Sequence, residues 1–135
     1  MATVQETGGK ATEGSQQPVP EWITNMYAAI DAFDVERFLT YLAPDCEFRF
    51  GNAPSVFGLD AIGAGVSGLF GALNSIRHQE IEAWEDANKA VASGIVTYTR
   101  RDDSTLTVPW AVIFHLEGGL VSRYLIYIND SQLFA

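Results

Sequence analysis

The last third of the chain, residues 96–130, predicts three consecutive strands whose two faces are both unusually apolar. Within it, Val108–Leu116 has one strongly polar side chain, His115, and the apolar character continues through Leu120–Val121 and Tyr124–Ile128. A solvated antiparallel sheet normally alternates apolar and polar residues, because only one face is buried. A hairpin that does not alternate must be covered on both sides. We expect the chain's own helices to cover one face, with a pocket between, and a second copy of the chain to cover the other.

Composition and charge exclude several classes of function. The 135 residues carry a formal net charge of −9, and the eight basic residues are scattered rather than gathered in the stripe that binds a phosphate backbone. No apolar run reaches the roughly 20 residues of a membrane-spanning helix. We therefore expect neither a nucleic-acid nor a membrane partner. Cys46 is the only cysteine, so the chain has no internal disulfide, and this favours a reducing cytoplasmic location. Cys46 and the two histidines do not have the spacing of a standard zinc motif. We expect no metal and no cofactor.

The chain divides into a polar N-terminal segment and one domain. Residues 1–20, rich in Gly, Ser, Gln, Thr and Pro, predict a disordered tail without the apolar core of a secretory signal, and residues 21–135 predict a single domain. Apolar residues at helical spacing predict helices over 21–33, 35–42 and 59–73. The predicted strands are 46–50, 76–84, 90–101, 105–116 and 120–129. Helices followed by an antiparallel meander are typical of an α+β fold with helices on one face of the sheet.

Two motifs resemble functional sites but have a simpler interpretation. Gly63–Gly68 matches G-x-G-x-x-G, yet it lies inside a helical pattern instead of directly after a strand, so it does not predict a dinucleotide site. These glycines indicate either close packing of the helix or a helix that moves as a lid. Asp102–Asp103 lies between two predicted strands and precedes Ser104, which favours a hairpin turn over a catalytic carboxylate pair.

The register of the predicted hairpin assigns its side chains to faces. A two-residue turn at Asp103–Ser104 would pair Trp110 with Thr97, which places Thr97, Arg101 and Trp110 on the pocket face. His115 would then lie among apolar residues of the outer face, as an interface or structural residue.

His78 follows Ile76 by two residues, so it points inward if Ile76 does. A histidine that faces a pocket can act as an acid or a base near neutral pH, and a purely structural histidine is the alternative.

Three segments carry a resemblance to a known family: DAFDVERFLTYLAPDCEFRFGN, VFGLDAIGAGV and VTYTRRDDSTLTVPWAVIFHLEGGLVSRYLIYIND. In the order of their elements and in their residue types, residues 21–134 resemble SnoaL-like polyketide cyclases and the wider nuclear-transport-factor-two-like superfamily. That superfamily includes ketosteroid isomerases and limonene-epoxide hydrolases. The resemblance implies a cone-shaped α+β fold in which N-terminal helices pack on a strongly curved, mostly antiparallel sheet that encloses an apolar pocket. It also implies a homodimer through the convex face of the sheet.

The family's catalytic carboxylates have no counterpart in this chain. Cyclases and epoxide hydrolases that it resembles carry an acid/base aspartate early in the last strand, in a D-x-x-D arrangement, where this chain has Ile126 and Asn129. Phe48 and Phe50 stand where relatives place polar catalytic groups on the first strand. Arg101 matches an arginine that supports the hydrolase aspartate.

The predicted site is therefore an apolar pocket with His78 as the catalytic residue. The residues expected to bind the ligand are Phe48, Phe50, Thr97, Arg101, Trp110, Tyr124 and Ile126. The first function left open is a cofactor-independent isomerase, cyclase or hydrolase that acts on a small apolar polyketide-, steroid- or terpenoid-like molecule. The second is binding of such a ligand without chemistry. The third is a structural or partner-binding module whose own aromatic residues fill the pocket.

Overall fold

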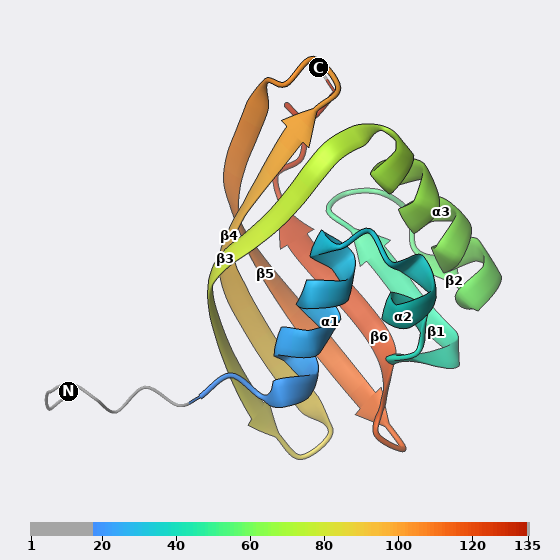
Figure 1. The fold of residues 1–135 in the computed structure, drawn as a ribbon. Coiled ribbons are helices and arrows are strands. Elements are labelled where there is room, and N and C mark those ends of the chain that lie inside the picture. The colour runs from blue at the N-terminus through green and yellow to red at the C-terminus, as the bar shows by residue number, and fades with distance from the viewer. Residues whose placement is uncertain (1–17, 135) are drawn as a thin grey trace, which may run out of the picture.

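The computed structural model describes residues 18–134, which form three helices and one six-stranded sheet (Figure 1). The helices are α1 (Glu21–Asp31), α2 (Val35–Leu39) and α3 (Leu59–Gly71). The strands are β1 (Leu42–Phe50), β2 (Val56–Phe57), β3 (Leu73–Asp86), β4 (Lys89–Arg100), β5 (Thr105–Glu117) and β6 (Leu120–Ile128). Their order in the sheet is β2-β1-β6-β5-β4-β3. The predicted tail, residues 1–20, lies outside the described residues except for its last three.

The predicted α+β class is confirmed. The three helices pack on one face of an open sheet, in which β1 and β6 are parallel and the other neighbouring strands are antiparallel (Figure 1). In α1 the three- and four-residue spacing of Ile23, Met26 and Tyr27 puts these side chains on one buried stripe against the sheet. No helix within residues 18–134 has the length and apolar character needed to cross a membrane.

The second helix is shorter than the sequence predicts. Its first turn is capped by Asp34, whose carboxylate accepts a hydrogen bond from the Arg37 backbone N–H at 3.1 Å. It ends at Leu39, and β1 begins at Leu42 instead of Cys46. Leu42 already pairs with Val121 of β6, and the Tyr41 carbonyl oxygen accepts a hydrogen bond from the Val121 backbone N–H at 2.9 Å, so the chain joins the sheet before it reaches Pro44.

Strand β3 is bent by an irregularity in its pairing with β4. The register shifts between Gln79 and Glu82, and Glu80 has a left-handed backbone with a φ of 56°. Gly94 of β4 lies against this bulge, and a Cβ atom there would lie 2.7 Å from the Gln79 carbonyl oxygen. Only glycine allows the two backbones to approach so closely, and β3 continues its pairing with β4 on both sides of the bulge.

The predicted register of the β4–β5 hairpin is wrong. Thr97 pairs with Thr107, and Trp110 pairs with Gly94. The Asp102 carboxylate accepts hydrogen bonds from the Ser104 backbone N–H at 3.0 Å and from its hydroxyl at 2.6 Å, and Asp103 adopts a φ of 69°. This longer turn replaces the two-residue one and shifts the pairing by three residues. An odd shift moves every side chain of one strand to the other face, so Thr97 lies on the outer face.

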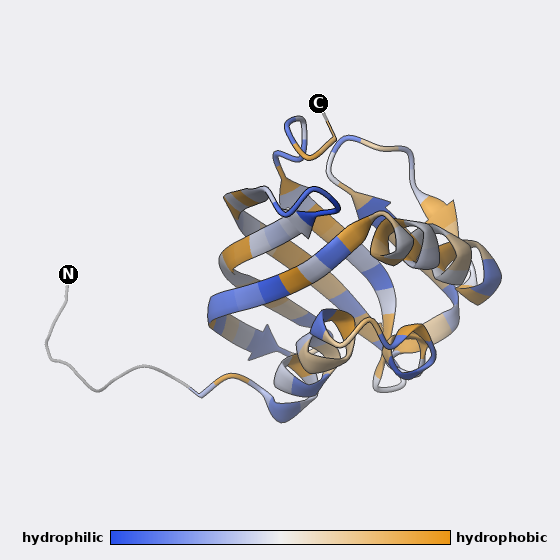
Figure 2. Cartoon of the chain, turned by 45° about the horizontal axis from the view of Figure 1, so that its top comes forward, coloured by the Kyte–Doolittle hydropathy of each residue, from blue (hydrophilic) through white to orange (hydrophobic). Residues whose placement is uncertain are grey.

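Hydrophobic residues recur along the strands (Figure 2), and pairing and burial place apolar side chains on both faces of the sheet. On the helix side, Phe114 is fully buried and makes edge contacts with Trp22 and Tyr124, with ring centroids 5.1 and 5.0 Å apart. On the outer side, Trp84 and Val91 are 49% and 40% exposed. The helices therefore cover one apolar face and leave the other open.

Candidate functional site

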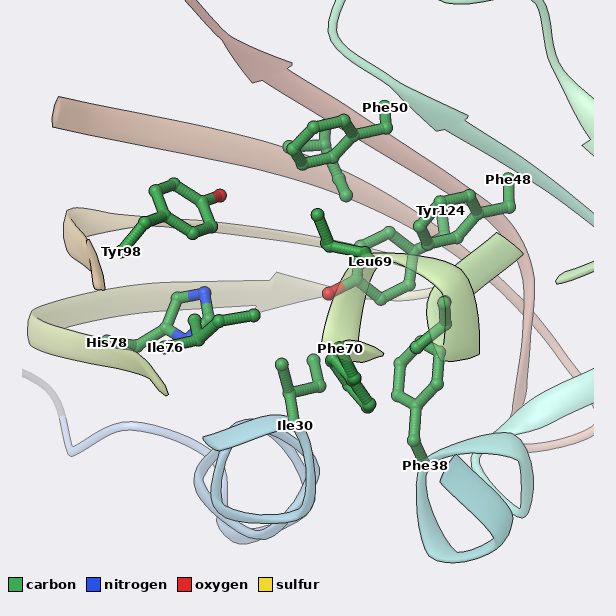
Figure 3. A pocket seen from close by; sticks show the side chains of 12 residues that line it. Ile30, Phe38, Phe48, Phe50, Leu69, Phe70, Ile76, His78, Tyr98 and Tyr124 are labelled. Atoms are coloured by element: carbon green, nitrogen blue, oxygen red, sulfur yellow. The ribbon is translucent and has the colours of Figure 1, made fainter. Parts of the chain in front are cut away.

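A small, mostly apolar pocket lies between the helices and the inner face of the sheet (Figure 3). Its cavity volume is about 60 Å³. Its walls come from all three helices and from β1, β3, β4 and β6. The lining residues are Ile30, Phe38, Phe48, Phe50, Val66, Leu69, Phe70, Ile76, His78, Tyr98, Tyr124 and Ile126. The polar side-chain atoms of this lining belong to one imidazole ring and two phenol groups.

His78 is held by a carboxylate at the end of α1. The ring Nδ1 lies 2.6 Å from Asp31 Oδ1, and the His78 backbone N–H donates to Asp31 Oδ2 at 2.9 Å. The side chains of His78 and Asp31 are 10% and 27% exposed. An ionised carboxylate can only accept hydrogen bonds, so Asp31 fixes the ring proton on Nδ1. The second nitrogen, Nε2, is then an unprotonated acceptor in the neutral ring.

Aromatic neighbours fix the orientation of the imidazole ring. Tyr27 and Trp110 pack against His78 with ring centroids 4.6 and 5.3 Å away. Figure 3 shows one ring nitrogen directed toward the side of the pocket where Tyr98 lies. Because Asp31 engages Nδ1, the nitrogen that faces the pocket is Nε2. The site therefore presents Nε2 of an oriented imidazole ring to an apolar cavity.

Two tyrosines bring hydroxyl groups to the same cavity. Burial raises the pKa of Tyr98, and the negative charges of Asp130 and Asp31 raise it further. Burial also raises the pKa of Tyr124, whose hydroxyl donates to the Tyr27 hydroxyl at 3.3 Å. Both phenols therefore stay protonated at neutral pH. The Tyr98 hydroxyl can donate a hydrogen bond to a ligand oxygen, and the Tyr124 hydroxyl can do so if it turns its O–H away from Tyr27.

The structure brings five of the eight predicted site residues together. Phe48, Phe50, His78, Tyr124 and Ile126 line the pocket.

The other three predicted residues lie elsewhere. Trp110 is outside the lining and contacts the His78 ring edge-on. Arg101 donates from Nε to the Gly71 carbonyl oxygen at 3.1 Å, where it caps the end of α3. The Thr97 hydroxyl lies 2.9 Å from that of Thr107 on the outer face. The placements of Thr97 and Arg101 in the pocket are therefore corrected, and both follow from the wrong hairpin register and turn.

Sequence reasoning missed Asp31 and Tyr98. The predicted register puts Thr97 on the pocket face, and strand alternation then puts its neighbour Tyr98 on the outer face. Asp31 carries a signal in the sequence, because a carboxylate in the last turn of a helix is unfavourable with the helix dipole and so suggests a partner elsewhere. The partner is His78, 47 residues further along the chain.

The described residues offer no obvious metal site. Within residues 18–134, no group of three or more His, Cys, Asp or Glu side chains is arranged to hold an ion.

The sequence profile of the SnoaL-like domain matches residues 23–124, which is most of the chain. The chain belongs to the SnoaL-like family. No curated protein matches this SnoaL-like chain. Solved structures with the same fold include a candidate polyketide cyclase from Xanthomonas campestris pv. campestris, with 16% identity, a TM-score of 0.76 and coverage of 82% of this chain and 90% of that one.

Two further structures share the SnoaL-like fold. A candidate polyketide cyclase from Pseudomonas putida KT2440 is 21% identical, has a TM-score of 0.76 and aligns over 84% of this chain and 92% of its own. TerC, co-crystallised with polyporic acid, is 20% identical, has a TM-score of 0.73 and aligns over 84% and 92%. At these identities the likeness establishes the fold alone.

Proposed function

We propose that this SnoaL-like protein is a cofactor-independent isomerase or cyclase that moves a proton next to the carbonyl group of a small apolar molecule. The observation that carries the proposal is the Asp31–His78 pair, with Nε2 of His78 facing an apolar cavity. A polyketide-, steroid- or terpenoid-like ketone has the required chemistry, because a carbon beside its carbonyl can lose a proton. The names of two structural neighbours, both candidate polyketide cyclases, agree with this class.

The reaction uses groups that line the pocket, together with Asp31, which contacts His78. Nε2 of His78 takes a proton from the carbon beside the carbonyl, and the electron pair of the broken C–H bond forms an enolate. Asp31 stabilises the imidazolium that results. A hydrogen bond from Tyr98 or Tyr124 stabilises the enolate oxygen. The enolate carbon or a conjugated carbon then recovers the proton from His78. Alternatively, the enolate carbon attacks a second carbonyl of the same molecule and closes a ring, and the alkoxide that forms takes the proton from His78.

The position of the base differs from the family's usual one. The resemblance aligns the family's acid/base aspartate with Ile126 of β6, which lines the pocket as an apolar residue. In this proposal the base lies instead on the edge strand β3 and reaches the same cavity from the same face of the sheet. Exchange of an aspartate for isoleucine on β6 keeps that wall of the cavity apolar, so a charged substrate group has no partner there.

Binding without chemistry is the second candidate function. The dominance of aliphatic and aromatic side chains in the lining favours it, because a mostly apolar cavity with a few polar groups is typical of small-molecule sites in general.

Exchange of α-protons for deuterium tests the proposal and separates it from simple binding. We expect the protein in deuterium oxide to accelerate exchange at the carbons beside the carbonyl of benzylacetone, with saturation kinetics, beyond the rate given by free imidazole at equal concentration. Proton NMR measures the loss of signal. A rate equal to that of the imidazole control, together with saturable binding of the ketone, would support binding without chemistry.

We also propose that the outer face of the sheet forms a homodimer. Across four strands, Trp84, Val91, Ile113 and Leu125 are successive pairing partners and make one apolar row on that face. Trp84 and Val91 are 49% and 40% exposed in the single chain, so covering this row removes apolar surface from water.

Light scattering coupled to size-exclusion chromatography tests the dimer. We expect the wild-type mass at micromolar concentration to be that of two chains, and Val91→Glu to give a single chain because a buried, unpaired carboxylate opposes association. Val56→Glu is the matched control, since Val56 is 37% exposed but lies on β2, away from the row. A monomeric wild-type protein would contradict the proposal.

A further inference from the structure

A second cavity adjoins the His78 pocket. It lies between α3 and the segment that joins β1 to β2, and its volume is about 190 Å³. The two cavities share Phe48, Phe50, Val66 and Leu69 as walls. We call the His78 pocket the inner cavity and the adjoining one the outer cavity. Because the four shared side chains belong to both, a molecule in one cavity lies next to the other.

The inner cavity is too small to hold a ring-sized substrate by itself. Its volume of about 60 Å³ is well below the ~150 Å³ of a cavity that admits benzene. It can hold the few atoms of a carbonyl group and its neighbouring carbon. The outer cavity exceeds that size. A substrate larger than a few atoms has to extend beyond the inner cavity, and the adjoining outer cavity is large enough to take the rest of it.

The outer cavity has the chemistry of a site for an uncharged hydrocarbon group. Besides the shared residues, it is lined by Ala53, Pro54, Val56, Ile62 and Gly65, so none of its walls carries a charged side chain or a hydroxyl. All of these except Ile62 are solvent-exposed, which places them at the mouth.

The glycine at the mouth has no packing role. A Cβ atom at Gly65 would meet no atom within 4 Å, whereas one at Gly63 would lie 3.2 Å from Leu39 Cδ1. Close packing therefore explains Gly63 but not Gly65, although glycine is less favourable than alanine inside a helix. A side chain at Gly65 would occupy the mouth of the outer cavity. The absence of one keeps the mouth open.

We propose that the outer cavity binds the apolar body of the substrate while its reacting carbonyl end lies beside His78. The substrate class that follows is an uncharged ketone that bears an aromatic ring or branched hydrocarbon a few carbons from its carbonyl group. This inference rests on the proposed function for the identity of the reacting group. The binding of the hydrocarbon group does not depend on any reaction.

Filling the mouth of the outer cavity tests the inference. We expect Gly65→Leu to raise the KM for exchange of benzylacetone about tenfold or more, and to leave the exchange of acetone, which has no hydrocarbon body, within about twofold of wild type. Gly68→Leu is the matched control, because it makes the same change in the same helix at a position with no atom within 4 Å and outside the lining. An unchanged KM for benzylacetone in Gly65→Leu would overturn the inference.

A ligand without a carbonyl group separates this inference from the proposed function. Butylbenzene has the ring and chain of the probe but cannot exchange α-protons. In nitrogen–proton NMR spectra we expect saturable shifts at the amides of Ala53, Val56 and Leu69 in wild type and Gly68→Leu, and their loss in Gly65→Leu. Butylbenzene binding without benzylacetone exchange would contradict the function and support the cavity. Benzylacetone exchange without butylbenzene binding would support the proposed function and contradict the role of the outer cavity.

Discussion

Replacing His78 with glutamine is expected to lower the rate of benzylacetone exchange about 100-fold or more. Glutamine keeps a polar side chain of similar reach, but its amide has no basic nitrogen to accept the proton. The rest of the cavity, including the Tyr98 and Tyr124 hydroxyls, stays in place. The measurement is the exchange rate by proton NMR, with cooperative urea unfolding as evidence that the variant is folded.

His115→Gln is the matched control for this prediction. His115 lies on the outer face, where burial and the positive charges of Arg123 and Lys89 lower its pKa. We expect its removal to leave the exchange rate unchanged, because its side chain has no access to the cavity. If His78→Gln retained a third or more of the wild-type rate, His78 would not be the base.

Replacing Asp31, the carboxylate that contacts His78, tests the same role of the pair. In Asp31→Asn the side chain can turn an N–H group toward Nδ1, which favours the tautomer with its proton on Nε2, and Nε2 then cannot accept a proton. We expect a loss of about tenfold to 100-fold in exchange, smaller than that of His78→Gln because the ring is still present. An Asp31→Asn variant at the wild-type rate would show that the pair is structural.

Replacing Gly94 with alanine is expected to reduce the free energy of unfolding by about 2–3 kcal/mol. The added Cβ would lie 2.7 Å from the Gln79 carbonyl oxygen and 3.1 Å from the Trp110 ring, so the bulge of β3 or the Trp110 side chain must move. Backbone opposite a bulge cannot relax without a loss of pairing. Trp110 in turn contacts the His78 ring, and we expect the exchange rate to fall as well.

Gly68→Ala is the control for this substitution. A Cβ atom at Gly68 of α3 meets nothing within 4 Å, so alanine there should raise the free energy of unfolding by about 0.5–1 kcal/mol. Urea unfolding followed by circular dichroism measures both changes. Equal effects of the two substitutions would contradict the close approach of β3 and β4 at Gly94.

The fold could be predicted from the sequence because its signals are local or additive. Helical spacing marks α1 and α3, and the apolar strands of the last third predict a sheet with two apolar faces. The pocket residues Phe48, Phe50 and Ile126 could be placed because the resemblance aligns them with the relatives' catalytic positions. Strand alternation then puts Tyr124 on the same face of β6 as Ile126, without knowledge of the turns.

The rest of the site depends on contacts that no local pattern encodes. The turn at Asp102–Ser104 is set by hydrogen bonds to the Asp102 carboxylate, and a different turn length moved Thr97 out of the pocket and Tyr98 into it. Asp31 reaches His78 because α1 packs on β3, a relation between segments 47 residues apart. Periodicity places each segment on its own element but does not dock one element on another.

The Asp31–His78 contact also has a mechanical consequence. Strand β3 is an edge of the sheet, and an unprotected edge can pair with other chains. One carboxylate holds both the ring and the backbone N–H of His78, so it ties α1 to this edge strand through two hydrogen bonds. The two hydrogen bonds of Asp31 therefore both orient the His78 ring and cover part of the β3 edge. A descendant that lost the acid–base pair would have to fasten the helix to that strand in another way.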